Sequence, residues 1–250
     1  MIVLFTDFGR TGPYVGQMHG AILRDWPAAR VVDLFADAPV HDPRRAAYLL
    51  AAYAEEFPPP AVFVCVVDPE VGGARQALAL EAGGRWFVGP DNGLLAIVAR
   101  RAEAASWRRI VWRPERLSAS FHGRDLFAPL AAKIVMARES GAGMPDGWFE
   151  PLSAADVVGR DWPDDLAEAI YVDGFGNVMI GLRAAILPPR AALILKNGRK
   201  IAQARTFSDV PRGEVFWYEN ANGLAEIAMN CGRASSALDL TVGASVKIRT

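Results

Sequence analysis

The sequence predicts an α/β protein with two domains. The first is an N-terminal βαβ-type domain with a mainly parallel sheet, and the second is a small C-terminal all-β domain with a barrel-like form. Three observations predict this fold class. Short β-prone runs alternate with helical patterns over residues 2–67, an apolar run rich in Val and Phe occupies residues 61–67, and long helical patterns stop after residue 140.

Strands and helices alternate at the start of the chain. β-prone runs at residues 2–6, 30–35 and 61–67 are separated by helical patterns at residues 14–26 and 43–57. This β-α-β-α-β order is typical of parallel strands joined by right-handed crossovers. The third run lacks polar residues, which indicates a strand buried on both faces.

The remainder of the first domain predicts a hairpin and two more helices. Two β-prone segments, 76–81 and 85–88, flank Gly83-Gly84, and such a dipeptide favours a tight hairpin. A helix is expected from about residue 94, a short strand at 107–112, and a long helix at about 125–140.

The expected domain boundaries follow from composition. We expect the N-terminal domain to span residues 1–140 and the C-terminal domain residues 167–250. The segment between them, 141–166, is rich in Gly, Pro and Asp and is interpreted as a linker. In the second domain, β-prone runs are found at 167–172, 191–195, 200–207, 214–218, 225–229 and 245–248, with at most a helical turn near 234–238.

Composition argues against several classes of partner. The 250 residues carry a net charge of −1, which does not indicate binding to nucleic acid or to an anionic membrane. Two distant cysteines, Cys65 and Cys231, do not form a disulfide framework. The N-terminal MIVLFTDFG lacks the basic region of a signal peptide, and no apolar run is long enough to span a membrane. We therefore expect a soluble cytoplasmic protein.

Polar side chains follow the predicted strands where ligands bind in open α/β sheets. Asp7 follows the first strand, Asp68 follows the third, Arg75 lies seven residues further on, and His122 precedes the long helix. Taken singly, an Asp after a strand is more often a turn or cap residue, and an isolated Arg or His is more often structural. Together they predict a site at one sheet edge, where Asp68, Arg75 and His122 handle a water molecule.

The segment DGFGN at residues 173–177 is the candidate ligand loop of the second domain. Asp173 is suited to an ammonium group, Phe175 to stacking on a planar ring, and Asn177 to donating and accepting hydrogen bonds with adenine. The alternative is a Gly-rich turn with a core Phe, which composition alone favours.

Other chemistries lack their motifs. The sequence has no G-x-S-x-G nucleophile elbow, no metal-ligand spacing among its three histidines, and no complete dinucleotide or P-loop pattern. The pair Arg124-Asp125 at a helix start is better interpreted as a cap and ion pair than as catalytic machinery. We expect no metal and no cofactor.

Six motifs in order give the sequence a family resemblance. They are TDFG with YVG (6–16), VVDPEVGGAR (66–75), PDNGLL (90–95), FHGRDLFAP (121–129), DGFGN (173–177) and NGLAEIAMNCGRA (222–234). With them the chain resembles the S-adenosyl-L-methionine hydrolases, or hydroxide adenosyltransferases, relatives of the fluorinating and chlorinating adenosyltransferases. The resemblance covers nearly the whole chain.

The resemblance implies hydrolysis of S-adenosyl-L-methionine to adenosine and L-methionine. S-adenosyl-L-methionine is then a substrate and not a cofactor. It also implies a homotrimer, with each site between one subunit's first domain and a neighbour's second. The implied catalytic residues are Asp68, Arg75 and His122. Substrate binding is implied for Asp7, Phe8 and His41 near the ribose, Asp173 at the methionine amino group, Phe175 and Asn177 at adenine, and Ala221 and Asn222 at the methionine carboxylate or adenine.

The chain departs from the family pattern at a few positions. Gly12 replaces an acid, Ile180-Gly181 replaces Thr-Asn, Asn220-Ala221-Asn222 replaces a usual Asn-Ser, and Glu70 replaces Gly in DPGVG. None of these touches Asp68, Arg75 or His122. Two alternatives stay open. One is a halide-using adenosyltransferase, although the halogenating relatives have different residues at the positions of Asp68 and His122. The other is a non-catalytic adenosine-binding protein.

Overall fold

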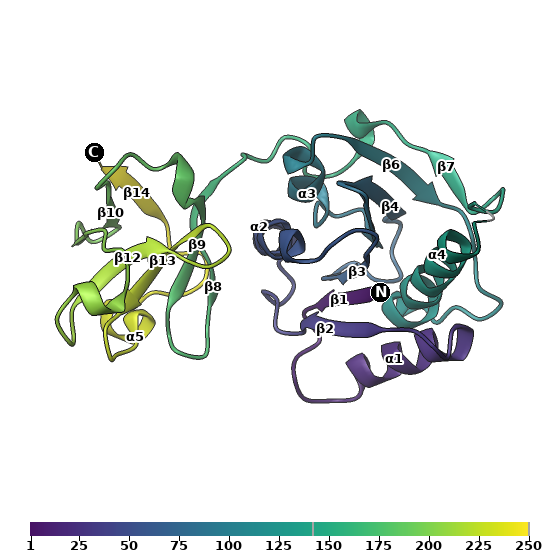
Figure 1. Ribbon diagram of the computed structural model, residues 1–250, viewed down its shortest axis with the longest axis horizontal. Helices are drawn as coiled ribbons and strands as arrows, with labels where there is room; N and C mark the ends of the chain where they lie inside the picture. Colours follow the sequence, from purple (N-terminus) through teal and green to yellow (C-terminus); the bar gives the residue numbers. More distant parts are fainter. Residues whose placement is uncertain (142, 250) are drawn as a thin grey trace. The chain divides into compact units, whose positions relative to one another are not determined.

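The computed structural model describes residues 1–141 and 143–249 and divides into two compact units, Met1–Trp162 and Pro163–Thr250 (Figure 1). Ala142, in the predicted linker, and Thr250, at the end of the predicted second domain, lie outside the described residues. Among the described residues, no helix combines the length and the apolar character that crossing a membrane requires. The α/β fold class with a second all-β part is confirmed.

The first unit is built on a seven-stranded sheet of order β2-β1-β3-β5-β4-β6-β7. The first three pairings in this order, from β2 to β5, are parallel, and the other three are antiparallel. Strands β4 and β7 therefore run against the other five. The strands are β1 (Ile2–Thr6), β2 (Val31–Phe35), β3 (Val62–Val66), β4 (Ala77–Ala82), β5 (Arg85–Pro90), β6 (Ala105–Ile110) and β7 (Phe149–Pro151).

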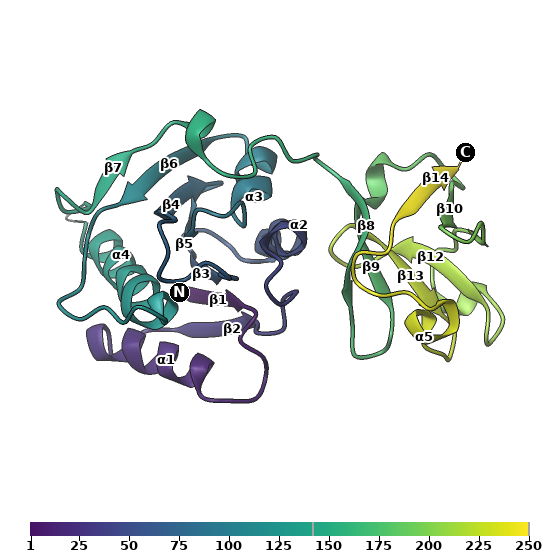
Figure 2. The same ribbon diagram turned by 180° about the vertical axis from the view of Figure 1, so that it is seen from behind.

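Helices cover both faces of this sheet. Helices α1 (Tyr14–Asp25) and α4 (Ala128–Ser140) lie on one face, and α2 (Pro43–Tyr53) and α3 (Ala96–Arg101) on the other (Figures 1 and 2). Both faces of β1 and β3 are thus shielded, and every residue of these two strands is buried. The prediction of a strand buried on both faces is confirmed, since apolar residues are needed on each side of such a strand.

Local sequence accounts for the element ends. Asp42 caps α2 by accepting a hydrogen bond from the backbone of Arg45 at 3.0 Å, and Pro43 occupies the first turn. Gly83 and Gly84 both adopt positive φ, 55° and 74°, in the tight turn between β4 and β5, as the predicted hairpin requires. The long helix begins with one π-helical turn, η2 (Gly123–Phe127), which precedes α4.

Most of the predicted linker packs within the first unit. Strand β7 extends the sheet beside β6, a short 3₁₀ turn η3 (Ala154–Asp156) follows, and the unit ends at Trp162. Asp91 accepts a hydrogen bond from the backbone of Val158 at 3.0 Å, and the ring of Trp162 fills the space beside Gly93. A segment rich in Gly, Pro and Asp can pack in this way because such contacts do not need regular secondary structure.

The second unit contains two antiparallel sheets, β12-β13-β9-β8 and β11-β10-β14. Strand β9 (Val178–Arg183) was not foreseen, because Gly181 interrupts its β-prone pattern, yet its Ile180 is fully buried. A Cβ at Gly181 would lie 2.8 Å from Leu166. The other elements of this unit are β8 (Leu166–Val172), β10 (Ala192–Leu195), β11 (Lys200–Ile201), β12 (Val215–Glu219), β13 (Leu224–Met229), α5 (Ala234–Leu238) and β14 (Val246–Arg249), with 3₁₀ turns at Ala184–Ile186 and Phe207–Asp209. The first unit has a further 3₁₀ turn at Ala54–Glu56, directly after α2.

Candidate active site

Asp68, Arg75 and His122 form one hydrogen-bonded set in the first unit. Nε of Arg75 donates to both carboxylate oxygens of Asp68, at 3.0 and 3.1 Å, and its Nη2 also donates to Asp68. The same Nη2 lies 2.9 Å from Nδ1 of His122. The side chains of Arg75 and Asp68 are only 5% and 4% exposed, so this ion pair is shielded from bulk water. The structure thus brings together the three residues predicted to handle water.

The contact between Arg75 and His122 defines the state of the imidazole. A guanidinium only donates hydrogen bonds, so Nδ1 of His122 must accept, and the proton of the neutral ring lies on Nε2. Burial lowers the pKa of His122, and the positive charge of Arg75 lowers it further. His122 is therefore neutral near pH 7, with an N–H donor on Nε2.

A glycine allows the loop that carries Asp68 and Arg75 to pack closely against the segment that precedes His122. Gly72 has a φ of +81°, and a Cβ there would lie 2.5 Å from the carbonyl oxygen of Ala119. A backbone hydrogen bond from Gly73 to the carbonyl of Glu70, at 2.9 Å, tightens the turn. The side chain of Glu70 itself is exposed. Gly72 thus allows the loop after β3 to touch the segment that leads to His122.

Asn92, in the turn that follows β5, anchors the end of β3, a role that the sequence does not predict. Its Nδ2 donates to the carbonyl oxygen of Val67 at 2.7 Å, immediately before Asp68. Within the motif PDNGLL, Oδ1 of Asn92 accepts from the backbone of Leu94 and forms a local turn, but no side chain of the described residues caps α3. The sequence pattern does not reveal that the amide nitrogen of the same side chain also bonds to the end of β3.

Asp7 follows β1 and lies beside the Asp68 end of β3. Burial raises the pKa of Asp7, the charge of Asp68 acts in the same direction, and a hydrogen bond from the backbone of His41 at 3.0 Å opposes them. His41 has a φ of 58°, in the left-handed region that non-glycine residues seldom adopt. The structure thus joins Asp7 and the His41 loop, both predicted to lie near a ribose.

Phe8 belongs to an aromatic cluster with Tyr14 and Phe121. The ring centroids lie 5.6 Å apart for Phe8–Phe121, 5.6 Å for Tyr14–Phe121 and 5.8 Å for Phe8–Tyr14. Since Phe121 immediately precedes His122, the cluster links the β1 loop to the imidazole. Tyr14 and Phe121 were not singled out as site residues, although both lie within the motifs that carry the family resemblance.

Arg124 and Asp125 form the predicted ion pair, and Asp125 also bonds to the preceding loop. Nε of Arg124 donates to Oδ1 of Asp125 at 2.6 Å, and the backbone of Ser118 donates to Oδ2 at 2.9 Å. The guanidinium also lowers the pKa of Asp125. The ion pair is confirmed, but the predicted helix cap is wrong, because no side chain in the described part of the chain caps this helix start. The bond from Ser118 instead holds the segment on the N-terminal side of His122.

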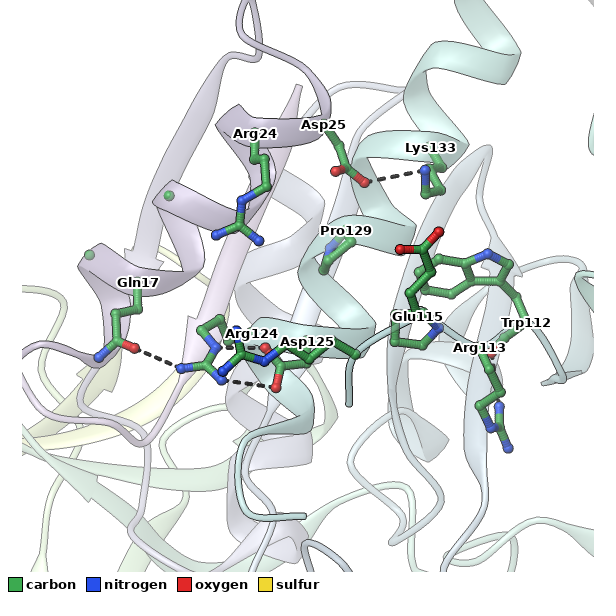
Figure 3. A pocket seen from close by; sticks show the side chains of 14 residues that line it. Gln17, Arg24, Asp25, Trp112, Arg113, Glu115, Arg124, Asp125, Pro129 and Lys133 are labelled. Carbon is green, nitrogen blue, oxygen red and sulfur yellow. Dashed lines mark hydrogen bonds and ion pairs between the residues drawn. The ribbon is translucent and has the colours of Figure 1, made fainter. Parts of the chain in front are cut away.

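A pocket of about 880 Å³ lies behind this ion pair, between α1 and α4 (Figure 3). Arg24 and Lys133 line it together with Arg124 and Asp125, and Lys133 pairs with Asp25 at 3.3 Å. None of the predicted site residues lines this pocket. We therefore place the candidate chemistry at the Asp68–Arg75–His122 set and not in this pocket.

In the second unit, Asp173 organises the DGFGN loop. Its Oδ1 accepts from the backbone of Phe175 at 2.9 Å and of Asn177 at 2.8 Å, and its Oδ2 accepts from Nδ2 of Asn177 at 3.2 Å. Phe175 is 79% exposed, so the alternative of a core Phe is wrong. The loop is a tight turn that presents an aromatic ring to its surroundings.

Ala221 and Asn222 lie in the turn between β12 and β13. The backbone of Asn222 donates to Oδ1 of Asn220 at 3.0 Å. Ala221 lines a pocket of about 560 Å³ together with Glu219 and Arg205. Among the described residues, no cluster of three or more His, Cys, Asp or Glu side chains has an arrangement that would hold a metal ion.

Comparisons with known proteins match both units. The family model described as the SAM hydroxide adenosyltransferase N-terminal domain matches residues 2–142, and the corresponding C-terminal domain model matches residues 167–247. An (R)-S-adenosyl-L-methionine hydrolase of Salinispora arenicola is 37% identical over 97% of this chain and 95% of its own length. Another of the same name, from Thermus thermophilus, is 36% identical over 99% and 98%.

Solved structures match the whole chain as well. A crystal structure of an uncharacterized conserved protein from Thermotoga maritima has a TM-score of 0.85 and 31% identity, and each chain is fully covered. A conserved hypothetical protein from Thermus thermophilus has a TM-score of 0.78 and 32% identity over 99% of each chain.

Proposed function

The chain belongs to the SAM hydroxide adenosyltransferase family, and on this premise we propose that it hydrolyses S-adenosyl-L-methionine to adenosine and L-methionine. The observation that carries this function is the hydrogen-bonded set of Asp68, Arg75 and His122 next to the end of β3, in which the Asp68–Arg75 ion pair is buried. Simple nucleoside binding does not need such a set. S-adenosyl-L-methionine is the substrate, so the adenosyl group is consumed rather than recycled.

The reaction is a displacement at the C5′ carbon of the adenosyl group. A water oxygen forms the new C5′–O bond, while the C5′–S bond breaks and its electron pair stays on sulfur. The leaving group is methionine, a neutral thioether, so it needs no general acid. The demanding part is the nucleophile, because neutral water is weak, and the site must therefore orient the water and remove its proton.

The hydrogen bonds favour Asp68 as the proton acceptor. Nδ1 of His122 is occupied by Arg75, so the ring presents Nε2–H, which orients the water oxygen by donating to it. Asp68 presents an acceptor-only carboxylate, and Arg75 holds it in place through two nitrogens. The guanidinium also stabilises the negative charge that develops on the oxygen as the proton leaves. The proton from water moves to Asp68.

The remaining predicted residues take the substrate. In this proposal the Asp7 carboxylate accepts hydrogen bonds from the ribose hydroxyls, and Phe175 stacks on adenine. Phe8 and His41 line the ribose, Asp173 faces the methionine ammonium, Asn177 bonds to adenine, and Ala221 and Asn222 face the methionine carboxylate or adenine.

We propose that the protein works as a homotrimer, with the first unit of one subunit and the second unit of a neighbour completing each site. The distribution of the predicted site residues supports this proposal. The water-handling groups belong to the first unit, and the exposed Phe175 loop belongs to the second. A cytoplasmic location is part of the proposal, since the two cysteines, Cys65 and Cys231, are both free thiols, as a reducing compartment favours.

The names of the relatives specify the (R) configuration, which we assign to the sulfur, and we propose the same preference for the present chain. The sulfonium bears three different carbon substituents and is therefore a stereocentre. A site that binds both the adenosyl and the methionine ends of the substrate places the C5′–S bond of the two epimers differently relative to Asp68. Hydrolysis of the (R) epimer is accordingly expected to be faster than that of the (S) epimer.

The test incubates the purified protein with each epimer of S-adenosyl-L-methionine in chloride buffer, and chromatography follows the products. Adenosine and L-methionine in equal amounts, with the oxygen of labelled water in the 5′ position, support the proposal. Formation of 5′-chloro-5′-deoxyadenosine would instead identify a halide-using adenosyltransferase. Tight adenosine binding without turnover at any pH would identify a binding protein.

A further inference from the structure

The second unit buries a carboxylate that the proposed chemistry does not use. Glu226 lies within β13 and is only 3% exposed. The hydroxyl of Tyr218 donates to its Oε1 at 2.6 Å, and Nδ2 of Asn220 donates to its Oε2 at 2.9 Å. A buried carboxylate is costly unless donors surround it, and an all-apolar strand would avoid that cost. The placement of Glu226 therefore calls for a reason.

One neighbour of Glu226, Asn220, determines the shape of the turn between β12 and β13. Its Oδ1 accepts from the backbone of Asn222 and of Leu224, each at 3.0 Å. With the amide oxygen engaged by two backbone donors, the amide nitrogen can only face Glu226. The carboxylate thus holds the side chain that shapes the turn carrying Ala221 and Asn222.

The other neighbour, Asn177, belongs to the DGFGN loop. Its Nδ2 donates to Oδ2 of Asp173 at 3.2 Å, and hydrogen bonding from its side chain to Glu226 opposes the rise in the pKa of Glu226 that burial causes. Both partners are carboxylates, so the amide nitrogen of Asn177, and not its oxygen, is turned towards them. The oxygen Oδ1 of Asn177 is then the atom left for a ligand.

We propose that Glu226 is a positioning residue for adenosyl recognition, which orients the amides of Asn177 and Asn220 and thereby holds the loops at residues 173–177 and 220–223 together. Tyr218 locks the carboxylate from its other oxygen. This inference rests on the proposed function, in which both loops bind the adenosyl group of the substrate.

The orientation of Asn177 has a consequence for base specificity. Its Oδ1 accepts hydrogen bonds only, so it favours a base with an amino group at position 6, such as adenine. Hypoxanthine carries an oxygen at that position, and two acceptors would then face each other. A site with a buried, oriented polar group discriminates strongly against a ligand that leaves the group unpaired. Glu226 therefore contributes to the preference for adenosine over inosine without touching either.

The experiment measures binding of adenosine and inosine to the full-length protein by calorimetry, for the wild type and for Glu226→Gln. Gln is the same size, but its amide brings a donor where Asn220 or Asn177 already donates. Adenosine affinity is expected to fall about tenfold or more, and the ratio of adenosine to inosine affinity to fall towards one. KM for S-adenosyl-L-methionine is expected to rise more than kcat falls.

A compensating double variant, E226Q/N220D, separates positioning from a simple loss of stability. The carboxylate introduced at position 220 still accepts from the two backbone groups. It also accepts from the amide introduced at position 226, whose oxygen remains available to Tyr218. The hydrogen-bond directions are restored, so adenosine affinity and base preference are expected to recover at least partly. Glu214→Gln is the matched control, since it removes the same charge from an exposed position of the same unit.

Two outcomes would overturn the proposal: folded Glu226→Gln with adenosine affinity within about twofold of the wild type and an unchanged base ratio, or a double variant no better than the single one. If Glu226→Gln does not fold, Tyr218→Phe decides in its place, because it removes a single donor, and an unchanged base ratio there contradicts the proposal. Adenosine binding needs no turnover, so a wild type that binds adenosine but does not cleave the substrate would refute the proposed function alone.

Discussion

Arg75 donates a hydrogen bond from Nη2 to Nδ1 of His122, 47 residues further along the chain, at 2.9 Å. The guanidinium simultaneously holds Asp68, so one cation sets the geometry of both its neighbours. This contact assigns the neutral imidazole its tautomer. It also supports the proposed separation of two roles that the residue types alone leave interchangeable, in which Asp68 takes the proton and His122 orients the water.

Replacing Asp68 with Asn is expected to lower kcat by roughly 10²–10⁴-fold, because a positioned base contributes about that factor. The amide keeps the size of the carboxylate but cannot take a proton from water. Initial rates of adenosine release measure the effect, and adenosine affinity is the control, which should stay within a few-fold of the wild type. Unchanged turnover in both Asp68→Asn and His122→Ala would refute the assignment of the set.

The activity of the wild type is expected to fall at acid pH. Burial and the charge of Arg75 lower the pKa of His122, so the neutral ring persists below the usual value of about 6.5. Protonation would put a hydrogen on Nδ1 against the donors of Arg75. Turnover should therefore stay level from pH 7 to 6.5 and decline only below it. A pH–rate profile of the wild type measures this.

Protein stability should follow the same titration. The unfolded chain binds a proton at His122 at a higher pH than the folded chain does, so the free energy of unfolding falls as pH is lowered from about 6.5 through the lowered pKa. Denaturant unfolding of wild type and His122→Ala across this range checks the sign. A variant with the same acid loss as the wild type would show that another group is responsible.

Gly72→Ala is expected to disrupt both stability and activity. The φ of +81° is strained for alanine, and the new Cβ would lie 2.5 Å from the backbone oxygen of Ala119. The strain alone costs about 1–2 kcal/mol, and the displaced segment carries His122. Gly198→Ala is the matched control: its φ is +83°, but no atom lies within 4 Å of the added Cβ. Thermal unfolding and kcat should separate the two variants, since only Gly72→Ala should lose turnover.

Phe175→Ala tests recognition with little effect on folding. Because the ring is 79% exposed, its removal should change the free energy of unfolding by only about 0.5 kcal/mol. Loss of stacking on adenine is worth about 1–3 kcal/mol, which corresponds to a loss of adenosine affinity of about 5- to 150-fold. Ile186→Ala, at another exposed apolar side chain, serves as control. Equal adenosine affinity in wild type and Phe175→Ala would remove Phe175 from the site.

Regular elements and their order could be predicted because their causes are local. The apolar run of β3, the cap and Pro at the start of α2, and the Gly83-Gly84 turn each depend on a few neighbouring residues. Strand β9 was not predicted, because Gly181 weakens its β-prone pattern. Its position in the sheet depends on pairing with β8 and β13. The packing of the segment before Trp162 could not be predicted, because its contacts, such as the hydrogen bond between Asp91 and Val158, join residues that are distant in sequence.

The family, the alternation of strands and helices, and the residues gathered at the strand ends can all be recognised in the amino-acid sequence. How those residues orient one another is visible only in the folded protein. Arg75 pairs with Asp68 and with one nitrogen of His122, Phe175 is exposed rather than buried, and Asp173 is engaged by its own loop. The physical reason is that hydrogen-bond direction, tautomer and burial depend on groups brought together by folding, and a linear motif specifies the groups without their orientation.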